Sequence, residues 1–142
     1  MADIVHMIQI TASPGSVYEL VATGTGFAQW WAEDVVERED GAVELGFFDR
    51  ATLYRLRPVV LRPGELASWR CETGDEWQGT TIEFALEPAT SGATLRFGHR
   101  GWRAPTDYFV SCNTTWGGLM FRLKAAAEGR APGPLFSRSG MY

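Results

Sequence analysis

The stretch from Thr80 to Glu128 reads TTIEFALEPATSGATLRFGHRGWRAPTDYFVSCNTTWGGLMFRLKAAAE, and its hydrophobic period changes once, near Gly101. Before this point apolar residues alternate with polar ones, which predicts two antiparallel strands joined by a short turn. After it the period becomes helical, and Pro105 suits the first turn of a helix of about 22 residues. This helix carries one apolar stripe, which predicts that it packs on the apolar face of the sheet. The stripe consists of Phe109, Cys112, Trp116, Met120 and Leu123.

The residues upstream of this stretch continue the same alternation. Residues 43–47, 54–60 and 67–72 each alternate between apolar and mostly polar positions, and turn residues separate them. Residues 4–11 form a further expected strand, rich in β-branched residues. Ser13-Pro14 then predicts the start of a short helix, and a second short helical stretch holds Trp30 and Trp31. Because these two rings are adjacent, we expect one of them to point away from the core.

This order of elements predicts an α+β fold, in which a curved antiparallel sheet wraps around a long C-terminal helix and two short helices follow the first strand. Residues 1–128 are expected to form a single domain, and residues 129–142 a C-terminal tail that contains Gly, Pro and Ser. Leu135 and Phe136 make part of this tail apolar, so we expect them to dock on a protein surface. That surface belongs either to the domain itself or to a second copy in a homodimer.

The composition narrows the classes of function. The formal net charge is −4 and no basic run occurs, which argues against a nucleic-acid partner. No stretch approaches the roughly 20 apolar residues of a membrane helix, and the N-terminus lacks a signal-peptide pattern. We therefore expect no membrane insertion and a cytoplasmic location. Cys71 and Cys112 have no CxxC spacing and are expected to be buried reduced thiols. The chain carries no metal-binding or cofactor-binding motif, so no metal or cofactor is expected.

Two clusters of acidic residues occur in expected turn regions, at residues 33–40 and 72–76. Paired carboxylates can serve acid–base chemistry, but acidic surface loops are most often solvated. We expect solvation to explain both clusters.

Several segments carry a resemblance to a known superfamily. They are ITASP at residues 10–14, FAQWW at 27–31, PGEL at 63–66, EWQGTTIEF at 76–84 and CNTTW at 112–116. In these segments the chain resembles START-like (SRPBCC) proteins, in the branch that includes the C-terminal domain of the heat-shock ATPase activator and polyketide-cyclase-like bacterial proteins. The resemblance implies the helix-grip fold, with a cavity between the sheet and the long helix. It leaves the function open, because lipid binders, cyclases and chaperone cofactors share this fold.

Aromatic residues make up 13% of the chain, including six Trp and eight Phe. Rings on inward strand positions and on the helix stripe either fill the core or line a cavity for an apolar molecule. The resemblance favours a cavity that is lined by at least some of these rings. The candidate ligand-binding residues are Phe47, Tyr54, Trp69, Trp77, Phe84, Phe97, His99, Phe109, Asn113, Trp116 and Met120.

His99 is the candidate catalytic residue. It shares its strand phase with Leu95 and Phe97, so its side chain is expected to face inward; by the same argument His6 faces the interior side of the first strand. The ordinary interpretation is a buried neutral imidazole bonded to a carbonyl or hydroxyl group. The functional alternative is an acid–base group in an apolar pocket, since histidine titrates near neutrality.

Three functions follow from these observations. The first is binding of a small hydrophobic or aromatic molecule. The second is a cyclase-like or dehydratase-like reaction, in which His99 transfers protons with the help of Asn113 or Tyr54. The third, which rests on the resemblance alone, is a protein-interaction module like the chaperone ATPase activators. The sequence does not decide whether the protein is an enzyme.

Overall fold

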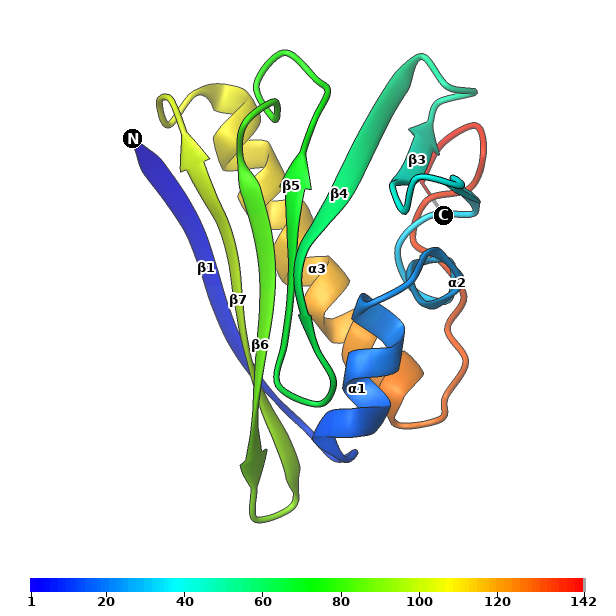
Figure 1. Ribbon diagram of the computed structural model, residues 1–142, viewed down its shortest axis with the longest axis vertical. Coiled ribbons are helices and arrows are strands. Elements are labelled where there is room, and N and C mark those ends of the chain that lie inside the picture. Colours follow the sequence, from blue (N-terminus) through cyan, green and yellow to red (C-terminus); the bar gives the residue numbers. More distant parts are fainter. Residues whose placement is uncertain (142) are drawn as a thin grey trace.

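Seven antiparallel strands form one sheet in the computed structural model, which describes residues 1–141 (Figure 1). The strands lie in the order β1-β7-β6-β5-β4-β3-β2, so each strand from β2 to β6 pairs with the next strand along the chain, and β1 pairs with the other side of β7. The predicted α+β class is confirmed, with two short helices after the first strand and one long helix at the end. The elements are β1 (Ala2–Ile10), α1 (Pro14–Val21), α2 (Gly24–Phe27), β2 (Asp34–Glu37), β3 (Val43–Phe47), β4 (Thr52–Arg62), β5 (Leu66–Cys71), β6 (Thr81–Ala89), β7 (Gly92–Trp102) and α3 (Asp107–Ala127).

The long helix α3 runs diagonally across one face of the sheet (Figure 1). Its N-terminus is capped by Thr106, whose hydroxyl accepts a hydrogen bond from the Phe109 amide, and Asp107 lies in the first turn, where a negative charge is favourable. Near its C-terminus Lys124 donates to the backbone carbonyl of Gln9, at 2.7 Å, and to Glu128, at 2.8 Å. These contacts fasten the end of α3 to the end of β1.

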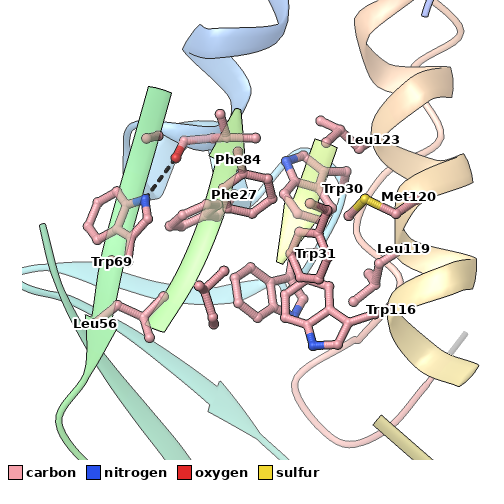
Figure 2. Close-up of a cluster of buried hydrophobic side chains, with 14 of the residues drawn as sticks. Phe27, Trp30, Trp31, Leu56, Trp69, Phe84, Trp116, Leu119, Met120 and Leu123 are labelled. Atoms are coloured by element: carbon pink, nitrogen blue, oxygen red, sulfur yellow. Dashed lines mark hydrogen bonds between the residues drawn. The ribbon is translucent and has the colours of Figure 1, made fainter. Parts of the chain in front are cut away.

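Aromatic side chains fill the centre of the space between the sheet and α3 (Figure 2). Phe27 lies between Trp69 and Trp31, with ring centroids 5.2 Å from each. Trp30 meets Phe84 edge to face at 6.1 Å. Met120 and Leu123 close this part of the core from the side of α3 (Figure 2). The middle of the sheet–helix interface is therefore packed core.

Two indole groups also complete the hydrogen bonding of α1. The last carbonyls of a helix have no partner within the helix. Trp30 Nε1 donates to the carbonyl of Leu20, at 2.8 Å. Trp69 Nε1 donates to the carbonyl of Val21, at 3.0 Å, the bond that is drawn dashed in Figure 2. These bonds fix α1 against the sheet and account for two of the six Trp residues.

The expectation that Trp30 or Trp31 turns away from the core is wrong. Both rings are buried and they lie nearly parallel to each other, with centroids 5.6 Å apart. The two residues lie in a turn after α2, and the C-terminal segment covers the side that would otherwise face solvent. Leu135 and Phe136 donate their amides to the carbonyls of Trp30 and Trp31, at 3.1 and 3.0 Å.

The acidic residues around position 34 are not simply a solvated loop, as the sequence suggested. Asp34 opens β2, a strand that the alternation did not reveal, and its side chain is buried. Arg50 binds it with two hydrogen bonds, at 2.9 and 3.0 Å, and holds the pKa of the Asp34 carboxyl below its usual value. Glu44 on β3 is buried in the same way, between Arg38 and Arg55. The ion pairs cover the outer face of β3, so all five of its residues are buried.

The C-terminal segment, residues 132–141, lies against the domain, so the predicted docking of the apolar tail is found within one chain. Phe136 forms a parallel bridge with Ala32, and its carbonyl accepts a hydrogen bond from the amide of Glu33, at 2.9 Å. Arg122 on α3 donates to the carbonyls of Pro132 and Gly133. The position of Tyr142 lies outside the described residues.

Candidate functional site

A pocket of about 260 Å³ remains at one end of the sheet–helix interface. The first half of α3 forms one wall, β3 and β4 form the opposite wall, and the C-terminal segment closes a third side. Rings dominate the lining, and hydroxyl groups are its main polar groups. No charged side chain is among the described residues of the lining, which are Trp31, Phe47, Phe48, Thr52, Tyr54, Trp77, Tyr108, Ser111, Cys112, Thr115, Trp116, Leu119, Phe136 and Met141.

The most regular part of the pocket is a pair of stacked rings. Tyr54 on β4 and Trp77 in the β5–β6 connection lie 3.7 Å apart, centroid to centroid, with an interplanar angle of 9°. Gly74 makes room for the pair: a Cβ atom at this position would lie 2.6 Å from Tyr54 Cε1. Its φ of +98° also favours glycine. The sequence Thr73-Gly74-Asp75 therefore supports the pocket wall as well as the turn.

A pair of phenol groups forms the polar edge of the pocket. The hydroxyl groups of Tyr54 and Tyr108 share a hydrogen bond of 2.5 Å. Burial raises the pKa of both phenols, that of Tyr108 to about 12, so both stay protonated at neutral pH. Burial likewise raises the pKa of the Cys112 thiol, and its neighbours Trp77 and Tyr108 offset only part of this effect. The described residues of the lining are therefore neutral at pH 7.

The rim of the pocket contains a strained turn. Phe48, Asp49 and Arg50 follow one another with φ values of 54°, 55° and 66°. A left-handed backbone costs a non-glycine residue roughly 1–2 kcal/mol, so this turn persists only because its surroundings hold it. The Arg50–Asp34 ion pair holds one end, and the amide of Asp49 donates to the carbonyl of Arg138, at 2.7 Å. The turn presents the half-exposed ring of Phe48 at the pocket entrance.

His99 lies behind the pocket wall, fully buried beneath Trp77 and Trp116. Trp116 Nε1 donates to His99 Nδ1, at 3.1 Å, so the ring proton must be on Nε2. Nε2 then donates to the Thr80 hydroxyl, at 2.8 Å, which in turn donates to the carbonyl of Trp77, at 2.6 Å. Burial lowers the pKa of His99 to about 3.

With both ring nitrogens bonded and a pKa this low, His99 holds the pocket wall in place and has no free nitrogen for proton transfer. This arrangement agrees with the ordinary interpretation of a buried neutral imidazole bonded to a hydroxyl. Proton transfer by His99, as the cyclase-like alternative requires, would need one of these two hydrogen bonds to break.

The structure brings four of the predicted ligand-binding residues together at the pocket: Phe47, Tyr54, Trp77 and Trp116. The others lie elsewhere. Trp69, Phe84, Phe97 and Met120 belong to the packed core. Phe109 is half-buried and meets Trp102 edge to face at 5.3 Å, and Asn113 is exposed on α3.

Sequence reasoning missed several lining residues. Four of them lie at helical spacing beside the predicted apolar stripe: Tyr108, Ser111, Thr115 and Leu119. Their spacing indicates a second face of the same helix, which the apolar stripe alone does not include. Phe48 lies in a turn, and no periodicity signals its position. Met141, like Phe136, comes from the tail, and only its apolar character hinted at contact with the domain.

Within residues 1–141, no group of three or more His, Cys, Asp or Glu residues is placed to hold a metal ion. No helix in the same range combines the length and the hydropathy that crossing a bilayer requires. Cys71 and Cys112 are both buried and unbonded to each other, as expected.

The curved sheet, the long helix and the pocket between them define a small α+β protein of the helix-grip type. The chain matches no family model and no curated protein. Among solved structures, it is similar to the Aha1 dimer from Colwellia psychrerythraea, with a TM-score of 0.80 and 30% identity over 91% of this chain and 98% of that one. The chain therefore belongs to the same family as this Aha1 protein.

Two more distant structures share the fold alone. DynU16, a protein in the dynemicin biosynthetic locus, is 16% identical with a TM-score of 0.76; the alignment covers 96% of this chain and 51% of DynU16. CalU16 from Micromonospora echinospora is also 16% identical, with a TM-score of 0.72, and the alignment covers 92% of this chain and 68% of CalU16.

Proposed function

We propose that this protein binds a small apolar or aromatic molecule in the pocket between α3, β3 and β4. The observation that carries the proposal is the lining itself: aromatic rings and neutral hydroxyl groups surround about 260 Å³ of space, without a charged side chain among the described lining residues. Ligand sites are typically concave and apolar, with a few polar groups that orient the molecule. The strained turn at the rim supports the same conclusion, because such strain concentrates at functional sites.

The volume limits the size of the occupant. It exceeds the ~150 Å³ of an engineered apolar cavity that binds benzene, and it lies just below the range of roughly 300–1,000 Å³ found for drug-sized ligands. We therefore expect a molecule of one or two rings.

The test is a titration with tetralin, a neutral bicyclic hydrocarbon. Binding is monitored by the intensity of the intrinsic Trp fluorescence and by the Tm in a thermal-shift assay. We expect saturable quenching and a raised Tm. A Thr115→Phe variant should lose this binding, because Thr115 lines the pocket and the added ring fills it. Thr114→Phe is the matched control, since Thr114 is exposed and lies outside the lining. Equal binding by both variants, or no binding by the unmodified protein, would contradict the proposal.

A second candidate is a protein-interaction module that forms a homodimer and acts on a chaperone ATPase. The relationship to an Aha1 protein solved as a dimer favours it. The outward face of α3 is a suitable surface for a second copy, because it exposes Phe121 and Val110 together with uncharged small residues. Light scattering after size exclusion tests the dimer, and Phe121→Glu should yield monomers. An ATPase assay with a bacterial chaperone tests the activity.

A further inference from the structure

We infer that Trp31 is the end wall of the pocket and determines its specificity, so that compact molecules of one or two rings bind and longer fused-ring molecules do not. The inference rests on the proposed binding function and specifies which class of ligand the pocket accepts.

The first observation is the place of Trp31 between the pocket and the packed core. Trp31 lines the pocket although the residue is only 1% exposed. On one side its ring meets that of Trp116, another lining residue, at 4.9 Å between centroids. On the other side it meets Phe27 at 5.2 Å and Trp30 at 5.6 Å, and neither of these lines the pocket. Figure 2 shows the ring of Trp31 between those of Trp30 and Trp116. In this direction the pocket therefore ends at the Trp31 ring.

The second observation is the support behind this ring. Phe27, which lies on the core side of Trp31, packs in turn against Trp69 at 5.2 Å and against Phe84 at 6.3 Å. All of these side chains are buried. Protein cores are packed as densely as organic crystals, so a ring that is supported in this way has little room to retreat before a ligand.

The third observation is that the backbone of Trp31 is held from both directions along the chain. Its amide donates to the carbonyl of Phe27, at 2.8 Å, and its carbonyl accepts a hydrogen bond from the amide of Phe136, at 3.0 Å. The turn after α2 and the C-terminal segment thus fix the same residue. Both the ring and the backbone of the end wall are consequently rigid.

The other large rings of the lining bound the pocket on the side of the sheet. Trp116 is backed by Phe97 on β7, at 4.4 Å between centroids, and Tyr54 and Trp77 stack on each other. Replacing Trp31 is therefore the change that extends the pocket toward the packed middle of the sheet–helix interface. The vacated space would be lined by apolar side chains, and engineered cavities of this kind stay dry and bind apolar molecules.

Two neutral hydrocarbons that differ by one fused ring test the inference: tetralin and 1,2,3,4-tetrahydroanthracene. Equilibrium dialysis measures the affinity of each, and the ratio of the two affinities is compared between proteins. We expect the wild type to bind tetralin at least about tenfold more tightly, because the third ring of the longer molecule collides with Trp31. We expect Trp31→Leu to reverse this order, because the third ring then enters the vacated space and buries additional apolar surface.

Trp69→Leu is the matched control. Trp69 is also only 1% exposed, but it lies outside the lining, and Phe27 separates its ring from that of Trp31. This variant should keep the wild-type order. Trp31→Phe is a milder truncation that covers the case in which Trp31→Leu does not fold, and cooperative urea unfolding shows which variants are folded. It should shift the ratio toward tetrahydroanthracene, in the same direction as Trp31→Leu.

The outcomes distinguish this inference from the proposed function. A wild type that binds tetrahydroanthracene as tightly as tetralin, or more tightly, would overturn the role of Trp31 and leave the binding function intact. The same conclusion would follow from a folded Trp31 variant that keeps the wild-type ratio, or from a Trp69→Leu variant that reverses it. Failure of both hydrocarbons to bind the wild type would overturn the proposed function itself.

Discussion

At the scale of single residues, His99 illustrates how a buried polar group can be structural. Its two ring nitrogens connect α3, through Trp116, to the turn before β6, through Thr80. Three hydrogen bonds in series, from Trp116 to the carbonyl of Trp77, fix the position of the rings that form the pocket wall. The residue that the sequence nominated for proton transfer thus lies behind the wall of the pocket, where its hydrogen bonds hold the rings in place.

This role predicts a dependence of stability on pH. The unfolded chain binds a proton at His99 near pH 6.5, whereas the folded protein does so only near pH 3. Stability from this group is therefore complete above pH 6.5 and is lost as the pH falls toward 3. The free energy of unfolding should fall by roughly 1.4 kcal/mol per pH unit across this window.

Urea unfolding of the wild type and a His99→Gln variant between pH 7 and 5 measures this effect, in a range where the carboxylates remain largely ionised. Glutamine can still accept from Trp116 and donate to Thr80, so we expect the variant to fold and to have a shallower slope. Parallel pH profiles for the two proteins would show that His99 does not titrate as described.

The sequence allowed part of this site to be predicted. Strand phase correctly placed the His99 side chain inward, because alternation along β7 depends only on local geometry. It did not reveal that Trp116 would occupy the second nitrogen, since that contact depends on how α3 lies across the sheet. For the same reason strand phase grouped Trp69 and Phe84 with Tyr54, although packing places the first two in the core.

At the scale of elements, the turn between β3 and β4 and the C-terminal segment depend on each other. The turn is held in a left-handed conformation by Arg50 and by the carbonyl of Arg138, which belongs to the segment. Neither the conformation of this turn nor the position of the C-terminal segment could be predicted from the hydrophobic pattern. The four residues of β2 were missed for a related reason: its short DVVE sequence includes two acids, and the ion pair that buries Asp34 comes from the turn.

The strain in this turn gives a direct prediction. Replacing Asp49, whose φ is 55°, with glycine should stabilise the protein by up to about 1 kcal/mol, because glycine adopts this conformation without a steric penalty. Ala51→Gly is the control: Ala51 is also exposed and lies in the same turn, but it is not among the residues with positive φ, so glycine there should destabilise. Chemical unfolding measures both, and a loss of stability in Asp49→Gly contradicts the assigned strain.

The C-terminal segment gives a second prediction at this scale. Phe136 meets Phe47 edge to face at 5.1 Å and is buried at the pocket. Phe136→Ala should lower the free energy of unfolding by about 3 kcal/mol, the low end of the range for buried Phe. The dissociation rate of tetralin should also increase. Met7→Ala, which truncates an exposed side chain on β1, should change stability by less than about 0.5 kcal/mol. Similar losses in the two variants would mean that the segment does not anchor on the domain through Phe136.

At the scale of the whole molecule, the fold was largely predictable and the location of the pocket was not. The fold follows from one change of hydrophobic period and from short turns, both of which are local signals. The pocket depends on where large rings fail to fill the space between the sheet and α3. That question involves volumes contributed by β3, β4, α3 and the C-terminal segment together, and no single stretch of sequence contains the answer.

The adjacency of β1 and β7 has a consequence for the synthesis of the chain. Ile4 pairs with His99, so the first strand made has no partner in the sheet until most of the polypeptide has left the ribosome. The rings around Phe27 stay uncovered for longer still, because the segments that cover them, α3 and the C-terminal segment, are synthesised last. A nascent chain of this protein therefore carries uncovered aromatic side chains through most of its translation, and such exposed apolar surface favours association with neighbouring chains.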